Sequence, residues 1–336
     1  MRWVDCYVWK PATVWLMAWS FAPVVLGQSQ SQTQPAWRPD KPVEFTVATA
    51  GGNSDRITRL AQRILQGRKL LTVPATVMNR TGGNQTLAAL HMTQHAGDAH
   101  YVLLANPAMF TNELNGISKL RYTDFTPLAL LVIESSVLAV RGASPLKNMN
   151  DLAERLKADP DSVSFAMPAR GGQPHLTAAS AVRAAGVDPR RMKVVVFKGS
   201  GESVTAMLGG HVDVMVSSAG SVLPLLQSGQ ARILGIAAAQ RMTGALASVP
   251  TFKEQGINTA GIAAWRGFVA PRGLTPTQIA FWDDALEKVS ETPEWKKGLD
   301  EGDVVRQYLR SREFGKYLDG EYALAKTVMS ELGLAK

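Results

Sequence analysis

The chain has 336 residues, of which 46% are hydrophobic and 19% are charged. This length exceeds one ordinary domain, and the composition excludes wholesale disorder because it supplies enough apolar side chains for a substantial core. The net charge of +8 comes from Lys and Arg residues that are scattered along the chain. Without a basic stripe interleaved with aromatic residues, the charge indicates a solvated basic surface, and we expect no nucleic-acid partner.

The amino terminus has the layout of a secretory signal peptide. A positively charged start precedes an apolar segment at residues 12–26, and the small residue Gly27 is followed by a polar tract. The apolar segment is shorter than the roughly 20 residues that span a bilayer, so we expect cleavage after Gly27. Residues 1–27 are then a signal peptide and 28–36 a disordered linker. The mature chain is expected to be secreted through the inner membrane as a soluble periplasmic protein.

The single cysteine, Cys6, lies inside the predicted signal peptide. The mature chain would therefore contain no thiol. This excludes a disulfide, a thiolate nucleophile and a thiolate metal site in the mature protein, and it excludes a lipid anchor on a cysteine after the apolar segment.

Beyond Pro42, short β patterns alternate with amphipathic helical patterns. Val43, Phe45 and Val47 alternate as in a strand, and a Gly51-Gly52 turn then leads into a helix from Asp55. The strands are predicted at 42–47, 71–78, 101–105, 163–167, 193–197, 212–216 and 233–238. The helices are predicted at 55–67, 86–95, 151–158, 174–185, 202–208, 276–290, 293–299 and 311–332. This alternation predicts two α/β units with parallel sheets and helices on their faces.

The strand-to-helix loops are the candidate binding segments. They lie at 49–55, 80–85, 169–175, 198–203 and 217–221, and each is rich in Gly, Ser or Asn. In open α/β sheets, ligands bind at the carboxyl ends of the strands, where loops expose backbone N–H groups at helix starts. Loops of this type on both halves are what a two-lobed binder requires.

Several of these loops carry recognisable motifs. They are Gly51-Gly52-Asn53-Ser54-Asp55, Asn79-Arg80-Thr81-Gly82-Gly83, Phe197-Lys198-Gly199-Ser200-Gly201 and Trp265-Arg266-Gly267. In this order they resemble the substrate-binding proteins of tripartite tricarboxylate transporters, the TctC-like or Bug family. The resemblance implies the α/β class and a type II periplasmic-binding-protein fold, with two α/β lobes joined by a two-strand hinge. Lobe 1 would comprise 37–137 and 240–336, and lobe 2 would comprise 138–239.

The resemblance also implies which residues bind the ligand. They are Ala50, Gly51, Gly52, Asn53, Asp55, Ala169, Arg170, Gly171, Gly172, His175, Gly199, Ser217 and Ser218. In the family, a ligand carboxylate is held by backbone N–H groups of such loops, and glycines allow the close approach. The chain departs from the family at Ala50, which replaces a proline, and at Gly172, which replaces a serine.

Three of these residues have a second interpretation. Arg170 adds a charge that could contact an extra carboxylate, or it is a solvated arginine. Asp55 orients the Gly-Gly loop or pairs with a ligand ammonium, or else it caps free N–H groups of its helix. His175 is a ligand-loop anchor, or it simply holds the helix start.

Catalytic, metal and cofactor motifs are incomplete in this sequence. His91 and His95 have the spacing of a metal pair, but no Glu follows His91. Ser144 and Lys147 match a Ser-x-x-Lys pattern without its companion motifs. We therefore expect no enzyme activity, no metal and no cofactor. A hydrolase or transferase is a further alternative, but no nucleophile–base arrangement is visible.

The resemblance implies a monomeric extracytoplasmic solute-binding protein. It would capture a small organic anion, a carboxylate-bearing metabolite, and deliver it to the membrane permease subunits of a tripartite tricarboxylate-type transporter. The alternative is a ligand-sensing binding protein that presents its closed form to a signalling receptor.

Overall fold

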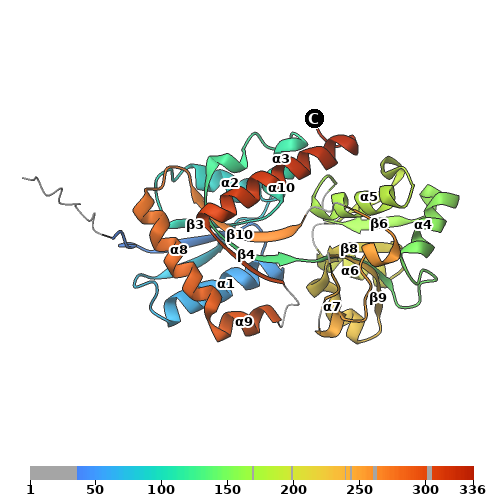
Figure 1. Ribbon diagram of the computed structural model, residues 1–336, viewed down its shortest axis with the longest axis horizontal. Coiled ribbons are helices and arrows are strands. Elements are labelled where there is room, and N and C mark those ends of the chain that lie inside the picture. Colours follow the sequence, from blue (N-terminus) through green and yellow to red (C-terminus); the bar gives the residue numbers. More distant parts are fainter. Residues whose placement is uncertain are drawn as a thin grey trace, which may run out of the picture. The chain divides into compact units, whose positions relative to one another are not determined.

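The computed structural model describes most of the chain beyond the amino terminus. The described residues are 36–168, 170–197, 200–238, 240–242, 244–259, 263–300 and 305–336. The predicted signal peptide, 1–27, and residues 28–35 of the predicted linker lie outside the described residues. The rest forms two β-sheets with helices on their faces (Figure 1).

Among the described residues, six strands form the first sheet. They are β1 (Val43–Val47), β2 (Ala75–Asn79), β3 (Tyr101–Ala105), β4 (Phe125–Glu134), β10 (Ala264–Pro271) and β11 (Val305–Arg310). Their order in space is β11-β4-β10-β3-β1-β2. Strand β1 is parallel to β2 and β3, whereas β10 is antiparallel to β3 and to β4. Strand β4 therefore runs in the same direction as β1, β2 and β3.

In the described part of the chain, five strands form the second sheet. They are β5 (Ser136–Arg141), β6 (Ser164–Met167), β7 (Lys193–Val196), β8 (Val214–Ser218) and β9 (Ala231–Ala237). The order is β7-β6-β8-β5-β9. Strand β6 is parallel to β7 and β8, and β5 is antiparallel to β8 and β9.

Helices cover both faces of the first sheet. They are α1 (Gly52–Gly67), α2 (Thr86–Thr93), α3 (Ala108–Leu114), α8 (Pro276–Glu291), α9 (Pro293–Asp300) and α10 (Ser311–Glu331). Helices α1, α8 and α9 share one hydrophobic core with β1, in which Ile57 and Trp282 lie with Phe45. Helices α2, α3 and α10 pack on the other face, where Phe110 and Phe314 are buried. This sheet with its helices is the first lobe.

The second sheet is covered in the same way by α4 (Met149–Ala158), α5 (Gln173–Ala184), α6 (Ser200–Leu208) and α7 (Ala219–Gln227). The side chains of β5 alternate between the two faces. Leu138 and Val140 lie in the core that contains buried residues of α4 and α5, whereas Val137 and Ala139 lie in the core that contains those of α6 and α7. This sheet with its helices is the second lobe.

Short 3-10 helices lie at Tyr122–Asp124, Pro160–Ser162, Pro189–Arg191, Gly244–Leu246 and Lys253–Gln255.

The two sheets are joined almost directly. Strand β4 of the first sheet ends at Glu134, and after Ser135 the chain enters β5 of the second sheet at Ser136. A second connection returns from β9 to β10. The register of pairing places Glu134 opposite Ala264, and Ser136 opposite Ser218. The crossover therefore links the end of β4 to the end of β8.

Several elements were absent from the sequence prediction. These are β4, β5, β10, β11, α3 and α7. The strand predicted at 71–78 was correct in type but starts later, at Ala75. Pro127 lies in β4, a strand with neighbours on both sides. Proline has no N–H to donate to a neighbouring strand, and here it lies next to a shift in the register of pairing between β4 and β10. Helix α7 contains Pro224, which makes it hard to recognise as a helix.

Candidate functional site

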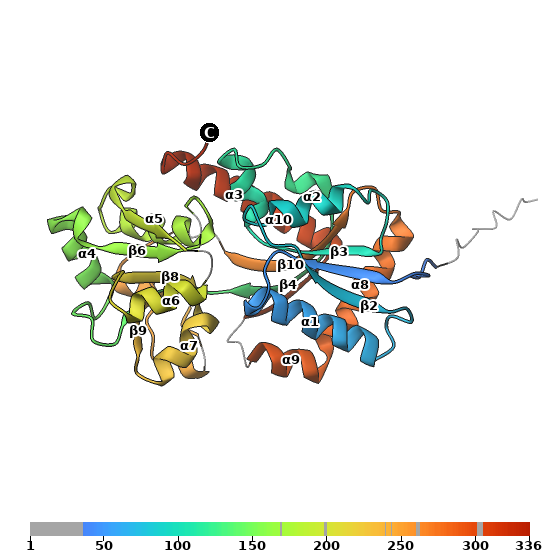
Figure 2. The same cartoon turned by 180° about the vertical axis from the view of Figure 1, so that it is seen from behind.

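The carboxyl ends of the strands in both lobes lie at edges that meet at the crossover. Because β1, β3 and β4 run in the same direction, their carboxyl ends share one edge of the first sheet. In the second sheet, β6 and β8 end at one edge, and the start of β5 is paired with the end of β8. Only Ser135 separates these two edges along the chain. The loops that follow β1, β6 and β8 therefore start from neighbouring edges (Figure 2).

The loop after β1 presents free backbone amides at the start of α1. Gly51 is the N-cap residue, with φ of 70°, and no side chain caps the first N–H groups of the helix. This left-handed backbone favours glycine because it lacks a Cβ. Ala50 and Gly51 are exposed. The start of the 16-residue helix α1 therefore offers hydrogen-bond donors and the positive end of its dipole.

Asp55 holds this loop in place. Its Oδ2 accepts a hydrogen bond from Arg59 Nε at 2.9 Å, and its Oδ1 accepts one from Asn79 Nδ2 at 2.9 Å. Burial on its own would raise the pKa of Asp55, but the hydrogen bonds from Arg59 and Asn79, the Arg59 charge and the Gly51 amide lower it below its usual value. Of the interpretations given above, the structure favours the one in which Asp55 orients the Gly-Gly loop.

A buried ion pair lies directly behind the first turn of α1. The Glu134 side chain accepts a hydrogen bond from Asn53 Nδ2 at 2.6 Å on Oε1, and one from Arg266 at 2.9 Å on Oε2. Arg266 Nε also donates to Ser54 Oγ at 3.1 Å. Sequence reasoning missed Glu134 altogether. The available signal was an acidic residue that ends the otherwise apolar strand β4.

The loop after β6 is organised by a buried histidine. His175 Nδ1 accepts a hydrogen bond from the Gly171 backbone N–H at 2.8 Å, and Gly171 has φ of 75°. Burial, with a smaller contribution from the charge of Arg170, lowers the pKa of His175 to about 4. The imidazole is therefore neutral at pH 7, which favours a role as anchor of the loop. Arg170 is exposed, and Gly172 is the N-cap of α5.

The remaining predicted residues of the second lobe lie around the end of β8. Ser217 is buried, and Ser218 Oγ lies 3.0 Å from Ser221 Oγ. Ser136, which is paired with Ser218, accepts a hydrogen bond from Gln173 Nε2 at 3.0 Å. The crossover is thus bonded to the first residue of α5. The predicted residues Ala169 and Gly199 lie outside the described residues.

Loops from the two lobes approach each other in the structure. Helix α1 contacts α7, whose N-cap is Ser218. A Cβ placed on Gly171 would lie 3.2 Å from Asn115 Nδ2, at the end of α3. Helix α1 and the loop after β6 therefore each approach the other lobe.

A cavity of about 870 Å³ lies beside the crossover. Its lining includes Glu134, Ser135 and Ser136, with Met242 and Phe252 from the second connection. Of the predicted ligand residues that the structure describes, none lines this cavity, although Glu134 and Ser136 connect it to both predicted loops by hydrogen bonds. Sequence reasoning had no signal for this cavity because its walls come from segments that are distant along the chain.

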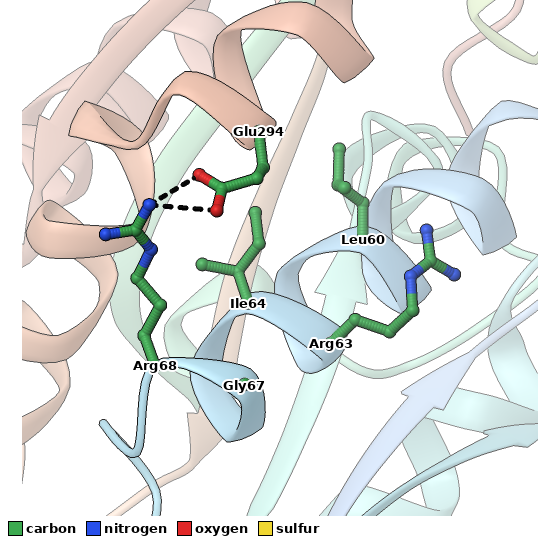
Figure 3. Close-up of a pocket in the computed structure, with 6 residues that line it drawn as sticks. All are labelled: Leu60, Arg63, Ile64, Gly67, Arg68 and Glu294. Carbon is green, nitrogen blue, oxygen red and sulfur yellow. Dashed lines mark hydrogen bonds and ion pairs between the residues drawn. The ribbon is translucent and has the colours of Figure 1, made fainter.

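A second depression lies at the other end of α1. Figure 3 shows Arg68, whose guanidinium donates to both carboxylate oxygens of Glu294 at 2.8 Å. The volume of about 650 Å³ is also lined by Leu60, Arg63 and Ile64. It lies towards the carboxyl-terminal end of α1, away from Gly51, so it is separate from the predicted ligand loops.

The histidine pair on α2 is engaged in local contacts. His91 Nε2 lies 2.9 Å from Glu44 Oε1, and the His95 ring stacks on Tyr101 at a centroid distance of 3.6 Å. Within the described ranges, no cluster of three His, Cys, Asp or Glu side chains is arranged to hold a metal ion. None of the helices among these residues is both long enough and apolar enough to span a bilayer.

Comparisons with known proteins place this arrangement in context. The family model described as the tripartite tricarboxylate transporter family receptor, TctC, matches residues 57–334. A protein of Cupriavidus necator, the UPF0065 protein in the gbd 5' region, is 29% identical over 317 residues, which cover 93% of each chain. Protein BugT of Bordetella pertussis is 28% identical over 246 residues, or 72% of this chain and 74% of BugT.

Solved structures show the same fold. MatC from Rhodopseudomonas palustris, solved with bound malate, is 25% identical with a TM-score of 0.75, over 86% of this chain and 99% of MatC. The periplasmic binding protein BugD gives a TM-score of 0.78 at 21% identity, over 89% of this chain and 99% of BugD. These likenesses and the two observed sheets confirm the predicted two-lobed periplasmic-binding-protein fold.

Proposed function

Because the chain belongs to the TctC family of tripartite tricarboxylate transporter receptors, we propose that it captures a small carboxylate-bearing metabolite and delivers it to membrane permease subunits. The observation that carries this proposal is the uncapped start of α1 at Gly51, held by Asp55 at the edge where the two sheets meet. Malate in the related MatC supports the choice of a carboxylate.

The proposed binding mode uses backbone amides. The carboxylate would be held by N–H groups of Gly52 and Asn53 in the first lobe, and by that of Gly172 in the second. The amides of Gly51 and Gly171 donate to Asp55 and His175 and so shape the two loops. Each charge-assisted hydrogen bond contributes about 1.5–3 kcal/mol net. A micromolar dissociation constant corresponds to about −8 kcal/mol, so a few such bonds account for it before the entropy of ordering is subtracted.

The other predicted residues support these amides. Asp55 and His175 hold the two loops, and Ala50, Ala169, Arg170, Gly199, Ser217 and Ser218 complete the set of ligand-binding residues. We propose the lobe boundaries close to the two connections: 137/138 lies near the start of β5, just after Ser135, and 239/240 lies between β9 and β10. Closure of the lobes on the ligand would present one shape to the permease.

We further propose that the protein acts by binding alone, as a monomer in the periplasm. His175, which would be the natural general base near these loops, is buried and accepts a hydrogen bond from a backbone amide. A nitrogen engaged in this way is not available to take a proton from a substrate.

The proposal is tested by thermal unfolding of the mature protein, from residue 28, with malate, succinate, adipate, citrate, glutamate and nicotinate, and with choline as a cationic control. A ligand at a hundred times its dissociation constant stabilises the folded state by about 2.7 kcal/mol, so at least one acid should raise the melting temperature. Uptake of that labelled acid should fall in cells that lack the gene. Stabilisation by choline alone, or by none of the acids, would contradict the proposal.

A further inference from the structure

The Glu134–Arg266 pair is buried at the crossover. The side chain of Glu134 is 2% exposed and that of Arg266 is 17% exposed, and their closest N–O distance is 2.9 Å. Removing a carboxylate and a guanidinium from water is costly unless each is paired and hydrogen-bonded. Both conditions hold here, because both oxygens of Glu134 accept hydrogen bonds and three nitrogens of Arg266 donate them.

The pair is bonded to the first turn of α1. Asn53 donates to Glu134, and Ser54 accepts from Arg266. These are the second and third residues of α1, whose free amides form the proposed anion site. An anion bound there would therefore lie close to one buried positive charge and one buried negative charge.

Two further charged groups lie on the first turns of α1: Arg56, which donates to Asn53 Oδ1 at 2.7 and 3.1 Å, and Asp55. Asp55 is paired with Arg59 at 2.9 Å. When a ligand carboxylate is poorly solvated, a full charge a few ångströms away changes the binding constant of that ligand by about tenfold or more. The two members of the buried pair must act on a bound anion in opposite directions, and their effects nearly cancel while both are present.

We propose that the Glu134–Arg266 pair sets the electrostatic potential of the ligand loop, with Arg266 as the cation that favours a bound carboxylate and Glu134 as the counter-charge that limits its affinity. This inference rests on the proposed function. Both residues act through the loop and are positioning residues. While both charges are present, the main-chain amides supply the net attraction for the anion, and loss of either charge unbalances the site.

A purely structural pair makes a different prediction from an electrostatic one. If the pair only held β4 and β10 together, then Glu134→Gln and Arg266→Met would both disturb the loop and both weaken ligand binding. If the pair sets the potential, Arg266→Met leaves an uncompensated carboxylate behind the anion, whereas Glu134→Gln leaves an uncompensated guanidinium. The two variants then change affinity in opposite directions.

The experiment measures dissociation constants by titrating malate, succinate, adipate and citrate into the mature protein, following the backbone amide signals of Gly51, Gly52 and Asn53 at constant ionic strength. We expect Arg266→Met to weaken binding about tenfold and Glu134→Gln to tighten it several-fold. The double variant should return to within a few-fold of the wild type. Urea unfolding should show lower midpoints for both single variants.

Two further variants complete the test. Arg266→Lys keeps the charge but loses the planar fork, so it should retain most of the affinity while lowering the unfolding midpoint, and it remains informative if Arg266→Met does not fold. Glu294→Gln breaks the ion pair at the other end of α1 (Figure 3) and should leave every dissociation constant unchanged.

The outcomes separate this inference from the proposed function. Weaker binding in both single variants, or a double variant as weak as Arg266→Met, would overturn the electrostatic role and leave the anion site standing. If no acid shifts the amide signals of Gly51, Gly52 or Asn53 in the wild type, the proposed function fails and the inference fails with it.

Discussion

His175 Nδ1 accepts a hydrogen bond from the backbone N–H of Gly171, four residues earlier in the chain, at 2.8 Å. An imidazole in this position must be neutral, because a protonated ring would place a second donor against the amide. The bond closes the loop after β6 and leaves Gly171 in a left-handed conformation. The geometry of this predicted ligand loop therefore depends on the protonation state of one side chain.

The first prediction concerns pH. The pKa of His175 is lowered from 6.5 to about 4 in the folded protein, so between these values the unfolded chain binds more protons. Stability is therefore fully present above pH 6.5 and falls as the pH is lowered towards 4, by about 3 kcal/mol in total. His175→Asn keeps an acceptor near Nδ1 but does not titrate there. Urea unfolding across this range should show a loss in the wild type that His175→Asn lacks; equal slopes for both proteins would contradict the prediction.

The second prediction concerns Asp55. Replacing Asp55 by Ala removes the hydrogen bonds from Arg59 and Asn79 and frees the Gly51 loop. We expect a loss of about 2 kcal/mol in unfolding free energy, and weaker binding of organic acids. Because the folded-state pKa of Asp55 is lowered, its contribution is present above its ordinary value of 3.8 and is lost at lower pH.

The control for Asp55 is another aspartate with an arginine or lysine four residues away. Asp284 pairs with Lys288 at 2.7 Å, but both side chains are more than half exposed. Asp284→Ala should change stability by less than about 1 kcal/mol and should leave ligand binding unaltered. Equal effects of the two substitutions would show that the buried network around Asp55 has no special role.

The third prediction compares the two ends of α1. Gly51 has φ of 70° and ψ of −176°, a conformation that is nearly restricted to glycine, although no atom lies within 4 Å of an added Cβ. Gly51→Ala should therefore destabilise the fold by about 1–3 kcal/mol through backbone strain alone, and should weaken anion binding. Gly67 ends the same helix with ordinary φ and equally open space. Gly67→Ala should stabilise by about 0.5–1 kcal/mol, and a loss of stability there would argue against this reasoning.

The parts of the site that could be predicted from sequence are local along the chain. Val43, Phe45 and Val47 alternate, and the glycines that follow mark a turn into α1. Asp55 and Arg59 are one helical turn apart, so their pairing follows from spacing. Fold class followed from the repetition of such signals and from the order of the family motifs.

The parts that could not be predicted depend on contacts between distant segments. Strands β4 and β5 form a nearly continuous apolar run, and strands buried on both faces lack a period of two. Glu134 and Arg266 are 132 positions apart, so no local pattern connects them. Trp265, next to Arg266 in the motif, is a packing residue, because its ring is fully buried beside Phe110 and Phe314.

The last prediction concerns Arg170, which is exposed and makes no hydrogen bond or ion pair with the residues that the structure describes. Its charge contributes to the lowered pKa of His175. Arg170→Gln should therefore raise the pKa of His175, which NMR titration of the imidazole protons would detect. It should also weaken binding of di- and tricarboxylates several-fold more than that of monocarboxylates, since a second anionic group would lose its counter-charge.

The matched control is Arg190→Gln, because Arg190 is an exposed arginine of the same lobe that is already paired with Asp188 at 2.8 Å. It should leave both the pKa of His175 and the relative affinities unchanged. If Arg170→Gln shifts the pKa of His175 but weakens all acids equally or not at all, then Arg170 influences the loop without contacting the ligand. A wild-type pKa of His175 in Arg170→Gln would instead show that burial alone keeps the imidazole neutral.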